Sequence, residues 1–442
     1  MSNKYQAYAE YKDSGVEWLG GIPLHWQLTR IKYITRCLDG ARIPLNAQER
    51  GDMQGDIPYW GANKVVGHVN NYIFDEELIL LGEDGAPFFD RTKEVAFNVT
   101  GKIWPNNHVH VLRPDNKKIE FRFLKYAINC ADFHLYISGS TRDKLNQSDM
   151  NEIYIRSCQL FEQENIANFL DHETVKIDTL IEKQQQLIKL LKEKRQAVIS
   201  HAVTKGLNPN APMRDSGVEW LGEVPEHWDV ISLKHLVSVP IIDGPHLTPT
   251  KLDEGIPFIS AEAISQGYIN FEKKWGYISR ENHELFSKRY SPRKGDILMV
   301  KLGATTGVVA MVETDDEFNV WVPLATIRAR ESISPKFVFY LLQSSSVRDA
   351  IQVSWTYGTQ QTLGLGTLSN LNMPVPSQEE AEDIVGVIES KIPLYDESVN
   401  KCEVSLQLLI ERRTALISAA VTGKIDVRNW QAPNSENKAI SA

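Results

Sequence analysis

A mainly apolar position recurs every seven residues in two long stretches of the chain. The first series runs through Leu170, Ile177, Gln184, Leu191 and Val198, and the second through Ile388, Tyr395, Cys402, Leu409 and Leu416. Sustained heptads with charged flanks predict coiled-coil helices. We expect the two helices to pack on each other through a seam that includes Ile177, Leu191, Val198, Tyr395, Leu409 and Leu416. The alternative is that each helix docks on its own domain.

The residues near the ends of these stretches are of types that start helices. Ser377 followed by Glu380 has the spacing of a capping box. Pro393 fits a second helix start or a kink. Helices of about 30 residues, starting near Glu173 and Pro393, would each span about 45 Å.

In the segments that precede the helices, apolar residues occur in short runs of the strand type. Their apolar runs are short, β-rich and bounded by Gly, Pro, Asn or Asp: ELILLG, VAFNV, HVHVL, DILMV, GVVAMV and VWVPLATI. Helical patterns, FRFLKYAIN and KFVFYLLQS, lie between them. Each segment is therefore predicted to be a small α+β domain with a surface of strands and loops.

The chain contains an internal repeat. DSGVEWLGGIPLHW ends at Trp26, and DSGVEWLGEVPEHW ends at Trp228, 202 residues later. A longer block matches at an offset of 218 residues, where EKRQAVISHAVTK precedes Gly206 and ERRTALISAAVTG ends at Gly423. Both glycines stand where C-terminal caps are expected. The order of variable region, helical block, variable region and helical block indicates a tandem duplication.

Composition places the chain among ordinary globular proteins. At 442 residues it has room for two to four domains. No apolar stretch resembles a signal peptide or a membrane span, and the scattered residues Cys37, Cys130, Cys158 and Cys402 suggest reduced thiols, so we expect a cytoplasmic protein with no membrane partner. The net charge of −9 weighs mildly against a stand-alone nucleic-acid binder.

The sequence lacks the motifs of the common catalytic sites. It has no phosphate loop, no HExxH zinc helix, no GxSxG elbow and no [DN]PP[YF] tetrapeptide of an amino-methyltransferase. GLGT at residues 364–367 lacks the strand and helix that a cofactor loop needs. His108 and His110 alternate on one strand, but no third metal ligand lies nearby in sequence. We therefore expect no catalysis, no metal and no cofactor in this chain.

One stretch of the second variable region is basic in a chain that is acidic overall. Between Glu272 and Lys301, eight basic residues oppose four acidic ones, and Trp275, Tyr277 and Tyr290 are interspersed among them. Positive charge with aromatic rings and loop glycines suits contact with phosphates and some reading of bases. The alternative is that these charges only solvate a surface.

The order of regions, with EQENIANFLDHETVKIDTLIEKQQQLIKLLKEKRQAVISHAVTKGL closing the first half, closely resembles the specificity subunits of type I restriction-modification systems. The opening DSGVEWLGEVPEHW is likewise typical of that family, and the resemblance covers about residues 12–428. It implies an α+β protein with a pseudo-two-fold internal repeat, in which two small mixed α/β target-recognition domains are joined by two long helices in an antiparallel coiled coil. The implied segments are an N-terminal tail (1–11), recognition domain 1 (12–160), helical spacer 1 (161–208), recognition domain 2 (209–376), helical spacer 2 (377–428) and a C-terminal tail (429–442).

The resemblance also implies a function and partners. Each domain would read one half of a split double-stranded DNA target, and the helices would set the gap and bind two modification subunits. Those methyltransferase subunits would use S-adenosylmethionine, and restriction or motor subunits would use ATP and Mg²⁺. Rival hypotheses are an adaptor that binds only proteins and a self-sufficient methyltransferase. Candidate DNA contacts on expected loops are Asn63, Lys64, Arg91, Lys93, Arg142, Lys144, Lys273, Lys274, Arg289, Lys301, Thr305, Thr306, Gln360 and Gln361.

Overall fold

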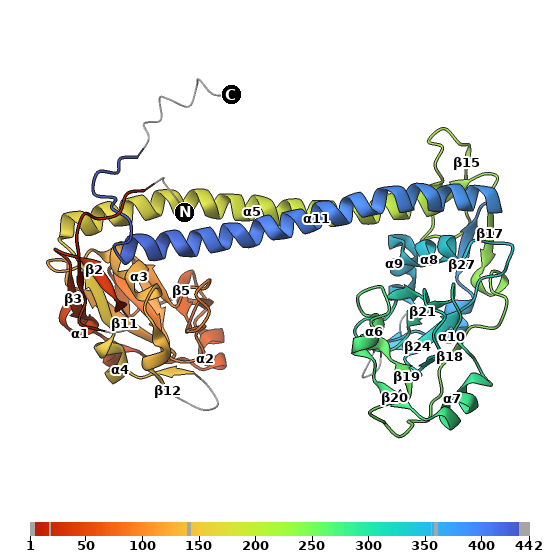
Figure 1. The fold of residues 1–442 in the computed structure, drawn as a ribbon, viewed down its shortest axis with the longest axis horizontal. Coiled ribbons are helices and arrows are strands. Elements are labelled where there is room, and N and C mark those ends of the chain that lie inside the picture. The colour runs from red at the N-terminus through yellow and green to blue at the C-terminus, as the bar shows by residue number, and fades with distance from the viewer. Residues whose placement is uncertain (1–4, 17–18, 139–142, 355, 358–360, 433–442) are drawn as a thin grey trace. The chain divides into compact units, whose positions relative to one another are not determined.

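The computed structural model describes residues 5–16, 19–138, 143–354, 356–357 and 361–432 (Figure 1). The chain divides into two compact units. Unit 1 comprises Met1–Gln185 and Glu403–Ala442, and unit 2 comprises Gln186–Cys402. The division therefore falls inside both long helices, α5 (Leu160–Lys205) and α11 (Gln378–Val421).

Unit 1 is built on two four-stranded sheets. The first has the order β4-β11-β8-β9, all antiparallel, and the second has the order β6-β5-β10-β7 with one parallel pair, β10 with β5. Their bounds are β4 (Thr35–Cys37), β5 (Ile57–Trp60), β6 (Val65–Val69), β7 (Phe74–Asp75), β8 (Leu78–Gly82), β9 (Ala96–Val99), β10 (Lys102–Pro105) and β11 (Val109–Pro114). The helix α3 (Phe121–Asn129), predicted from FRFLKYAIN, packs in the same core as β8 and the start of α5.

Unit 2 repeats this plan. One sheet has the order β18-β24-β21-β22, and a three-stranded sheet has the order β20-β19-β23 with β19 parallel to β23. Their bounds are β18 (Ile242–Asp243), β19 (Ile256–Ile259), β20 (Gly276–Ile278), β21 (Ile297–Val300), β22 (Val309–Met311), β23 (Asn319–Val320) and β24 (Leu324–Ile327). The helix α8 (Pro335–Gln343), predicted from KFVFYLLQS, corresponds to α3, and α9 (Ser345–Val353) follows it.

Short elements complete both units. In unit 1 they are β1 (Tyr11–Asp13), β2 (Gly21–Pro23), β3 (Gln27–Arg30), α1 (Ile31–Ile34), α2 (Ala47–Asp52), β12 (Ile137–Ser138), β13 (Lys144–Leu145), α4 (Gln147–Glu152) and β14 (Tyr154–Ser157). In unit 2 they are β15 (Met213–Asp215), β16 (Glu223–Pro225), β17 (Asp229–Ser232), α6 (Ala261–Ile264), α7 (Arg280–Ser287), β25 (Thr356–Tyr357), β26 (Gln361–Thr362), α10 (Leu365–Ser369) and β27 (Asn372–Val375). In each unit the first strand after the HW dipeptide pairs with the last strand before the long helix, as β3 with β14 and β17 with β27.

The predicted seam between the helices is present. In α5 the less exposed positions alternate by four and three residues through Ile177, Ile181, Gln184, Ile188, Leu191 and Arg195, and in α11 through Ile388, Ile392, Tyr395, Val399, Cys402, Leu406 and Leu409. Within unit 1, Leu416 of α11 shares a hydrophobic core with Ile177 of α5. Each helix also contributes to domain cores, because Ile166 lies in the core of unit 1 and Ile199 in that of unit 2. The seam and the docking on domains therefore coexist.

The expected helix starts near Glu173 and Pro393 were wrong. The helix α5 begins at Leu160 and α11 at Gln378, so they have 46 and 44 residues. The earlier turns form because their apolar faces are buried, as at Phe169 in unit 1. Pro393 lies inside α11 with its ring exposed, and buried Ile392 and Val399 hold the helix on both sides of it despite the lost hydrogen bond.

The repeated PxHW motif joins the ends of the two helices. In unit 1, Glu162 in the first turn of α5 accepts hydrogen bonds from Trp26 Nε1 (2.9 Å) and His25 Nε2 (2.8 Å). The cap Gly423, with φ +71°, ends α11 against the same tryptophan, and a Cβ there would lie 2.4 Å from Pro23 Cγ. The motif therefore fixes where one helix begins and the other ends.

Unit 2 has the same junction. Glu380 in the first turn of α11 accepts from Trp228 Nε1 (3.0 Å) and His227 Nε2 (2.9 Å), and Ser377 Oγ caps the Glu380 amide. The carboxylate thus contacts the motif instead of closing the predicted capping box. Gly206, with φ +74°, ends α5 beside Trp228.

Candidate nucleic-acid interface

A pair of backbone hydrogen bonds builds the same loop frame in both units. Gly85 N donates to Asp143 O (3.0 Å), and Gly303 N donates to Gln361 O (3.1 Å). Leu145 N donates to Glu83 O (2.7 Å), and Leu363 N to Lys301 O (2.8 Å). Every residue here has its counterpart 218 positions away, which confirms the offset read from the sequence.

In unit 2 this frame brings several predicted residues together. Lys301 directly follows β21, Thr306 Oγ1 donates to Gly303 O (2.7 Å), and Gln361 accepts from Gly303 N through its backbone oxygen. Thr305 lies in the same loop and accepts from Val308 N (3.1 Å). The side chains at this frame are therefore held by backbone bonds from two segments that are distant in sequence. Arg142 and Gln360 lie outside the described residues.

Other predicted residues of unit 2 lie apart from this frame in the fold. Lys273 ends a 3-10 helix (Phe271–Lys273) and is exposed. Lys274 Nζ donates to Phe271 O (3.1 Å) and stands 4.6 Å from the centre of the Tyr277 ring. The basic stretch thus begins at the 3-10 helix before β20 and ends at Lys301 in the loop frame.

The candidates of unit 1 occupy three places. Asn63 and Lys64 are exposed in the turn between β5 and β6, closed by a bond from Gly61 N to Lys64 O (2.9 Å). Lys144 on β13 lies at the loop frame, with its Nζ 3.5 Å from Glu83 Oε1. Arg91 and Lys93 lie in the loop after β8.

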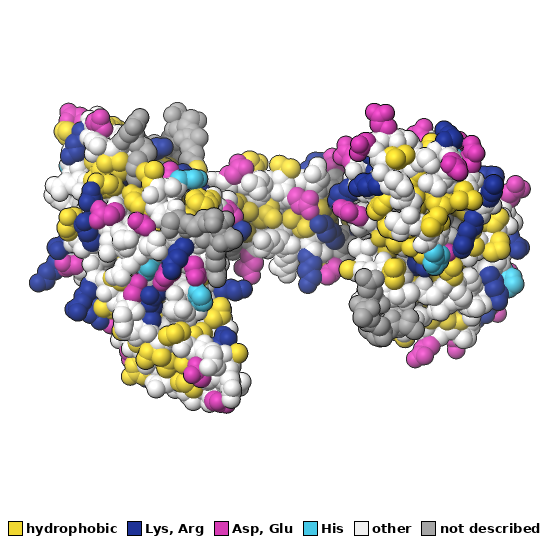
Figure 2. All heavy atoms as spheres, turned by 90° about the horizontal axis from the view of Figure 1, so that it is seen from below, with side chains coloured by type: hydrophobic (Ala, Val, Ile, Leu, Met, Phe, Trp, Pro, Cys, Tyr) yellow, Lys and Arg dark blue, Asp and Glu magenta, His cyan; other side chains and the backbone are white. Residues whose placement is uncertain are grey.

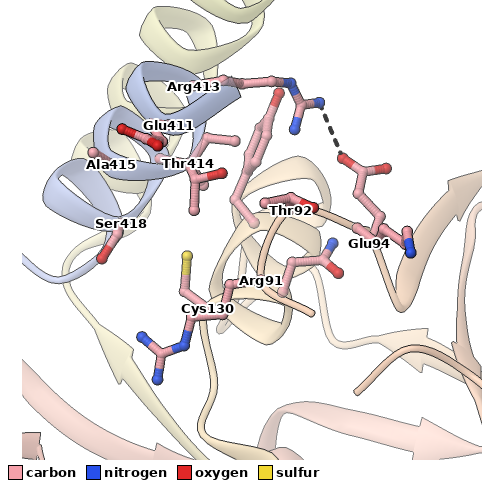
Figure 3. A pocket seen from close by; sticks show the side chains of 13 residues that line it. Arg91, Thr92, Glu94, Cys130, Glu411, Arg413, Thr414, Ala415 and Ser418 are labelled. Atoms are coloured by element: carbon pink, nitrogen blue, oxygen red, sulfur yellow. Dashed lines mark hydrogen bonds and ion pairs between the residues drawn. The ribbon is translucent and has the colours of Figure 1, made fainter. Parts of the chain in front are cut away.

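Arg91 and Lys93 line a cavity of about 310 Å³ between that loop, α3 and the last turns of α11. Figure 3 shows Cys130 with its sulfur directed toward α11, and Arg413 bound to Glu94 across the cavity (3.4 Å). The corresponding place in unit 2 is bridged by hydrogen bonds from Gln196 Nε2 to Gln343 O (2.7 Å) and from Ser345 N to Ser200 Oγ (2.8 Å). The two units therefore differ here in how the domain meets the helix.

Two aspartates at the loop frames, the partly buried Asp39 and the buried Asp243, were missed by the sequence reasoning. Asp39 follows β4 and Asp243 ends β18, and these strands pair equivalently with β11 and β24. A signal existed in the sequence, because Leu38-Asp39-Gly40 and Ile242-Asp243-Gly244 repeat with nearly the offset of the opening motif.

In unit 1 the aspartate belongs to an internal network. Asp39 accepts from His110 Nδ1 (2.6 Å) and from Val111 N (2.8 Å), while His110 Nε2 contacts Leu145 O (2.8 Å). Burial opposes ionisation of Asp39, but the bond from His110 holds the pKa of its carboxyl below its usual value. Glu83 lies close enough to complete a three-residue metal-like cluster. However, Arg42 Nη1 binds Glu83 (2.6 Å), and both ring nitrogens of His110 are engaged, so these donors fit an internal salt bridge better than a metal.

Surface charge is mixed in both units. On the face that Figure 2 shows, Lys and Arg side chains are interspersed with Asp and Glu, and hydrophobic side chains lie among them. Many basic side chains are paired, as in Arg113 with Glu76 (2.6 Å) and Arg280 with Glu317 (2.7 Å). Pairing of this kind reduces the positive charge that these side chains present to solvent. Among the described residues, no helix is long and apolar enough to cross a membrane.

Two domains of one fold, with one loop frame and different side chains on it, define a duplicated recognition protein. The chain matches the family model described as type I restriction modification DNA specificity domain twice, over residues 23–190 and 225–392. It is 26% identical over 382 residues to the type I restriction enzyme EcoBI specificity subunit of Escherichia coli, covering 83% of this chain and 77% of that protein. It is 22% identical over 440 residues to the MjaVIII specificity subunit of Methanocaldococcus jannaschii, covering 95% and 98%.

A solved structure shows the same fold. A chain from a study of complex assembly and conformational transition of the type I R-M system superposes with a TM-score of 0.65 at 15% identity, covering 91% of this chain and 99% of that one. Because the family model covers more than half of the residues, the chain belongs to the family of type I restriction-modification DNA specificity proteins. Its function is recognition of a DNA target. The family match does not support the alternative of an adaptor that binds only proteins.

Proposed function

We propose that each unit reads one half of a split duplex target, and that the antiparallel pair of α5 and α11 sets the gap between the halves. The observation that carries this proposal is the duplicated loop frame. Its backbone bonds at Gly85 and Gly303 are the same, while equivalent side chains differ, as in Glu83 and Lys301. A constant frame with different side chains is what two readers of different sequences require.

The catalytic chemistry is assigned to partner subunits. The relatives are named as specificity subunits of restriction enzymes, and the solved neighbour comes from a study of complex assembly. Two modification subunits would bind S-adenosylmethionine and methylate adenine, and restriction or motor subunits would use ATP and Mg²⁺. The mixed surface charge supports this division, because partners would then supply phosphate contacts.

The helices offer equivalent apolar docking positions for two copies of a partner. Leu190 in unit 2 and Leu408 in unit 1 stand 218 residues apart and are 52% and 59% exposed. Leu187 and Val404 are also exposed beside them in sequence. Exposed leucines at matching places on a duplicated helix suit two identical partners.

A domain exchange tests the reading by halves. Residues 27–157 are replaced by the equivalent segment of a related specificity subunit, so that the paired strands β3 and β14 move together while Trp26 and Glu162 stay in place. The hybrid is expressed with its modification partner, and methylated sites are mapped by genome-wide sequencing. The expected result is a change in one half of the target with an unchanged gap. A change in both halves would contradict independent reading.

A further inference from the structure

The buried carboxylate of Asp243 is surrounded by basic side chains from three segments of unit 2. Its side chain is 5% exposed. Oδ1 accepts from Arg289 Nη2 (2.8 Å), while Oδ2 lies 3.0 Å from Lys301 Nζ and 3.2 Å from His246 Nε2. A single negative charge therefore faces the two permanent positive charges of Arg289 and Lys301.

The position of Asp243 is fixed by the backbone around it. β18 pairs with β24, which places Asp243 opposite Ala325. At Gly244, a Cβ would lie 2.1 Å from Val320 O and 2.5 Å from the carbonyl carbon of Trp321. Only a glycine permits this contact, so the loop that follows Asp243 is held tightly against the end of β23.

The groups that Asp243 binds differ in their access to solvent. The Lys301 side chain is 12% exposed, whereas that of Arg289 is 51% exposed. Lys301 thus serves as a local counter-charge for the carboxylate. Within the described part of the chain, Nε and Nη1 of Arg289 have no protein partner, which leaves these donors available to a ligand.

The equivalent aspartate of unit 1 is used differently. Asp39 is bound by His110, which is 1% exposed, by the amide of Val111 and, at 3.5 Å, by Arg42 Nη2. The Arg42 side chain is only 15% exposed, so the arginine at Asp39 is mostly buried, unlike Arg289. Position 301 is a lysine where position 83 is a glutamate, and that glutamate is neutralised by Arg42. One frame therefore supports an internal network in unit 1 and an exposed guanidinium in unit 2.

We propose that Asp243 is a positioning residue that orients the Arg289 guanidinium toward a pair of acceptor atoms on the DNA half-site read by unit 2. This inference rests on the proposed function. Guanine O6 and N7 in the major groove present such a pair. A planar guanidinium held through one Nη can direct its other donors in a fixed direction.

The test uses the complete complex with its modification subunits. The target is first identified by methylation mapping, and Kd is then measured for three duplexes: the target, the target with its second half scrambled, and the target with its first half scrambled. For Asp243→Asn, discrimination at the half read by unit 2 is expected to fall roughly 10-fold, the range of one lost bidentate contact. Discrimination at the other half should remain.

A charge control separates orientation from electrostatics. Asp253→Asn makes the same change at an exposed position of unit 2. Both variants remove one negative charge, so binding to the scrambled duplexes should not weaken in either. Only Asp243→Asn should reduce discrimination. If the two variants behave alike, Asp243 acts through charge alone and the proposal is wrong.

Arg289→Gln keeps the test valid if Asp243→Asn fails to fold in thermal melts. It should reproduce the loss, and the double variant should lose no more than Arg289→Gln alone, because both changes act on one contact. Additive losses, or full discrimination in Arg289→Gln, would overturn the proposal. Loss confined to one base pair identifies the guanine, whereas a uniform loss on all duplexes with a salt slope reduced by about 1 would show a phosphate contact and overturn the proposal. If the unaltered complex fails to discriminate at all, the proposed function fails instead.

Discussion

Arg195 of α5 donates from Nε to Oδ1 of Asp396 on α11 over 2.7 Å. The residues that correspond by the 218-residue offset make the same bond, from Arg413 Nε to Asp178 Oδ1, also over 2.7 Å. The two bridges lie in different units, and each joins an arginine in the C-terminal half of one helix to an aspartate near the middle of the other. They show that the antiparallel pairing has the same register on both sides of the internal repeat.

The two bridges are expected to differ in their contribution to stability. Arg195 and Asp396 are 32% and 54% exposed, so Arg195→Ala should lower the free energy of unfolding by about 0.2–1 kcal/mol. Arg413 is 21% exposed and also binds Glu94, so Arg413→Ala should cost more, about 1–3 kcal/mol. Urea denaturation of the two variants checks this order. Equal losses would show that the additional bond to Glu94 contributes nothing.

The junction carboxylates provide a second matched pair. Glu162 is 5% exposed and binds Tyr8, His25 and Trp26, whereas Glu380 is 28% exposed and binds only His227 and Trp228 among its described partners. Glu162→Gln should therefore destabilise by about 1–3 kcal/mol, and Glu380→Gln by less, because a buried group loses more when its charged hydrogen bonds weaken. Thermal melts of both variants give the comparison. A larger destabilisation by Glu380→Gln than by Glu162→Gln would contradict this prediction.

The cavity cysteine should be slow to react. Burial raises the pKa of the Cys130 thiol to about 12, so the thiolate is scarce at pH 8. Alkylation followed by peptide mapping should modify Cys130 far more slowly in the folded protein than in guanidinium chloride. In the folded protein its rate should keep rising with pH up to about 12. A folded-state rate equal to that in denaturant would contradict this.

The helices are expected to act as a ruler. Inserting one heptad near Gln184 and one near Cys402 keeps the seam in phase and lengthens each helix by about 10 Å. That length equals about three base pairs and about 100° of duplex rotation. The variant should methylate a site with a longer gap or lose activity. Methylation of the original site at full efficiency would show that the helices serve only for docking.

Sequence periodicity predicted the seam, the repeat and most strands because these depend on local spacing. The frame at Gly85 and Gly303 was also accessible, since one ungapped offset connects it to the helical blocks. The roles of Asp39 and Asp243 could not be predicted, because their partners His110 and Arg289 lie 71 and 46 residues away in sequence. Pro393 was misread as a helix start because proline is a local signal, whereas the burial of Ile392 and Val399 on either side of it depends on the tertiary fold.

The matching bridges make the first half of the chain self-complementary. Asp178 and Arg195 lie on the same helix, so two copies of α5 in antiparallel arrangement would each supply both partners of the other's bond. Gly206 would then end each helix against Trp26 of the second copy, as Gly423 does within this chain. A fragment of residues 1–212 should therefore form a closed symmetric dimer, detectable by light scattering, and dissociate more readily when Arg195 is replaced by Asp. With its modification partner, such a dimer should recognise an inverted repeat, because its two reading domains would be identical and related by two-fold symmetry.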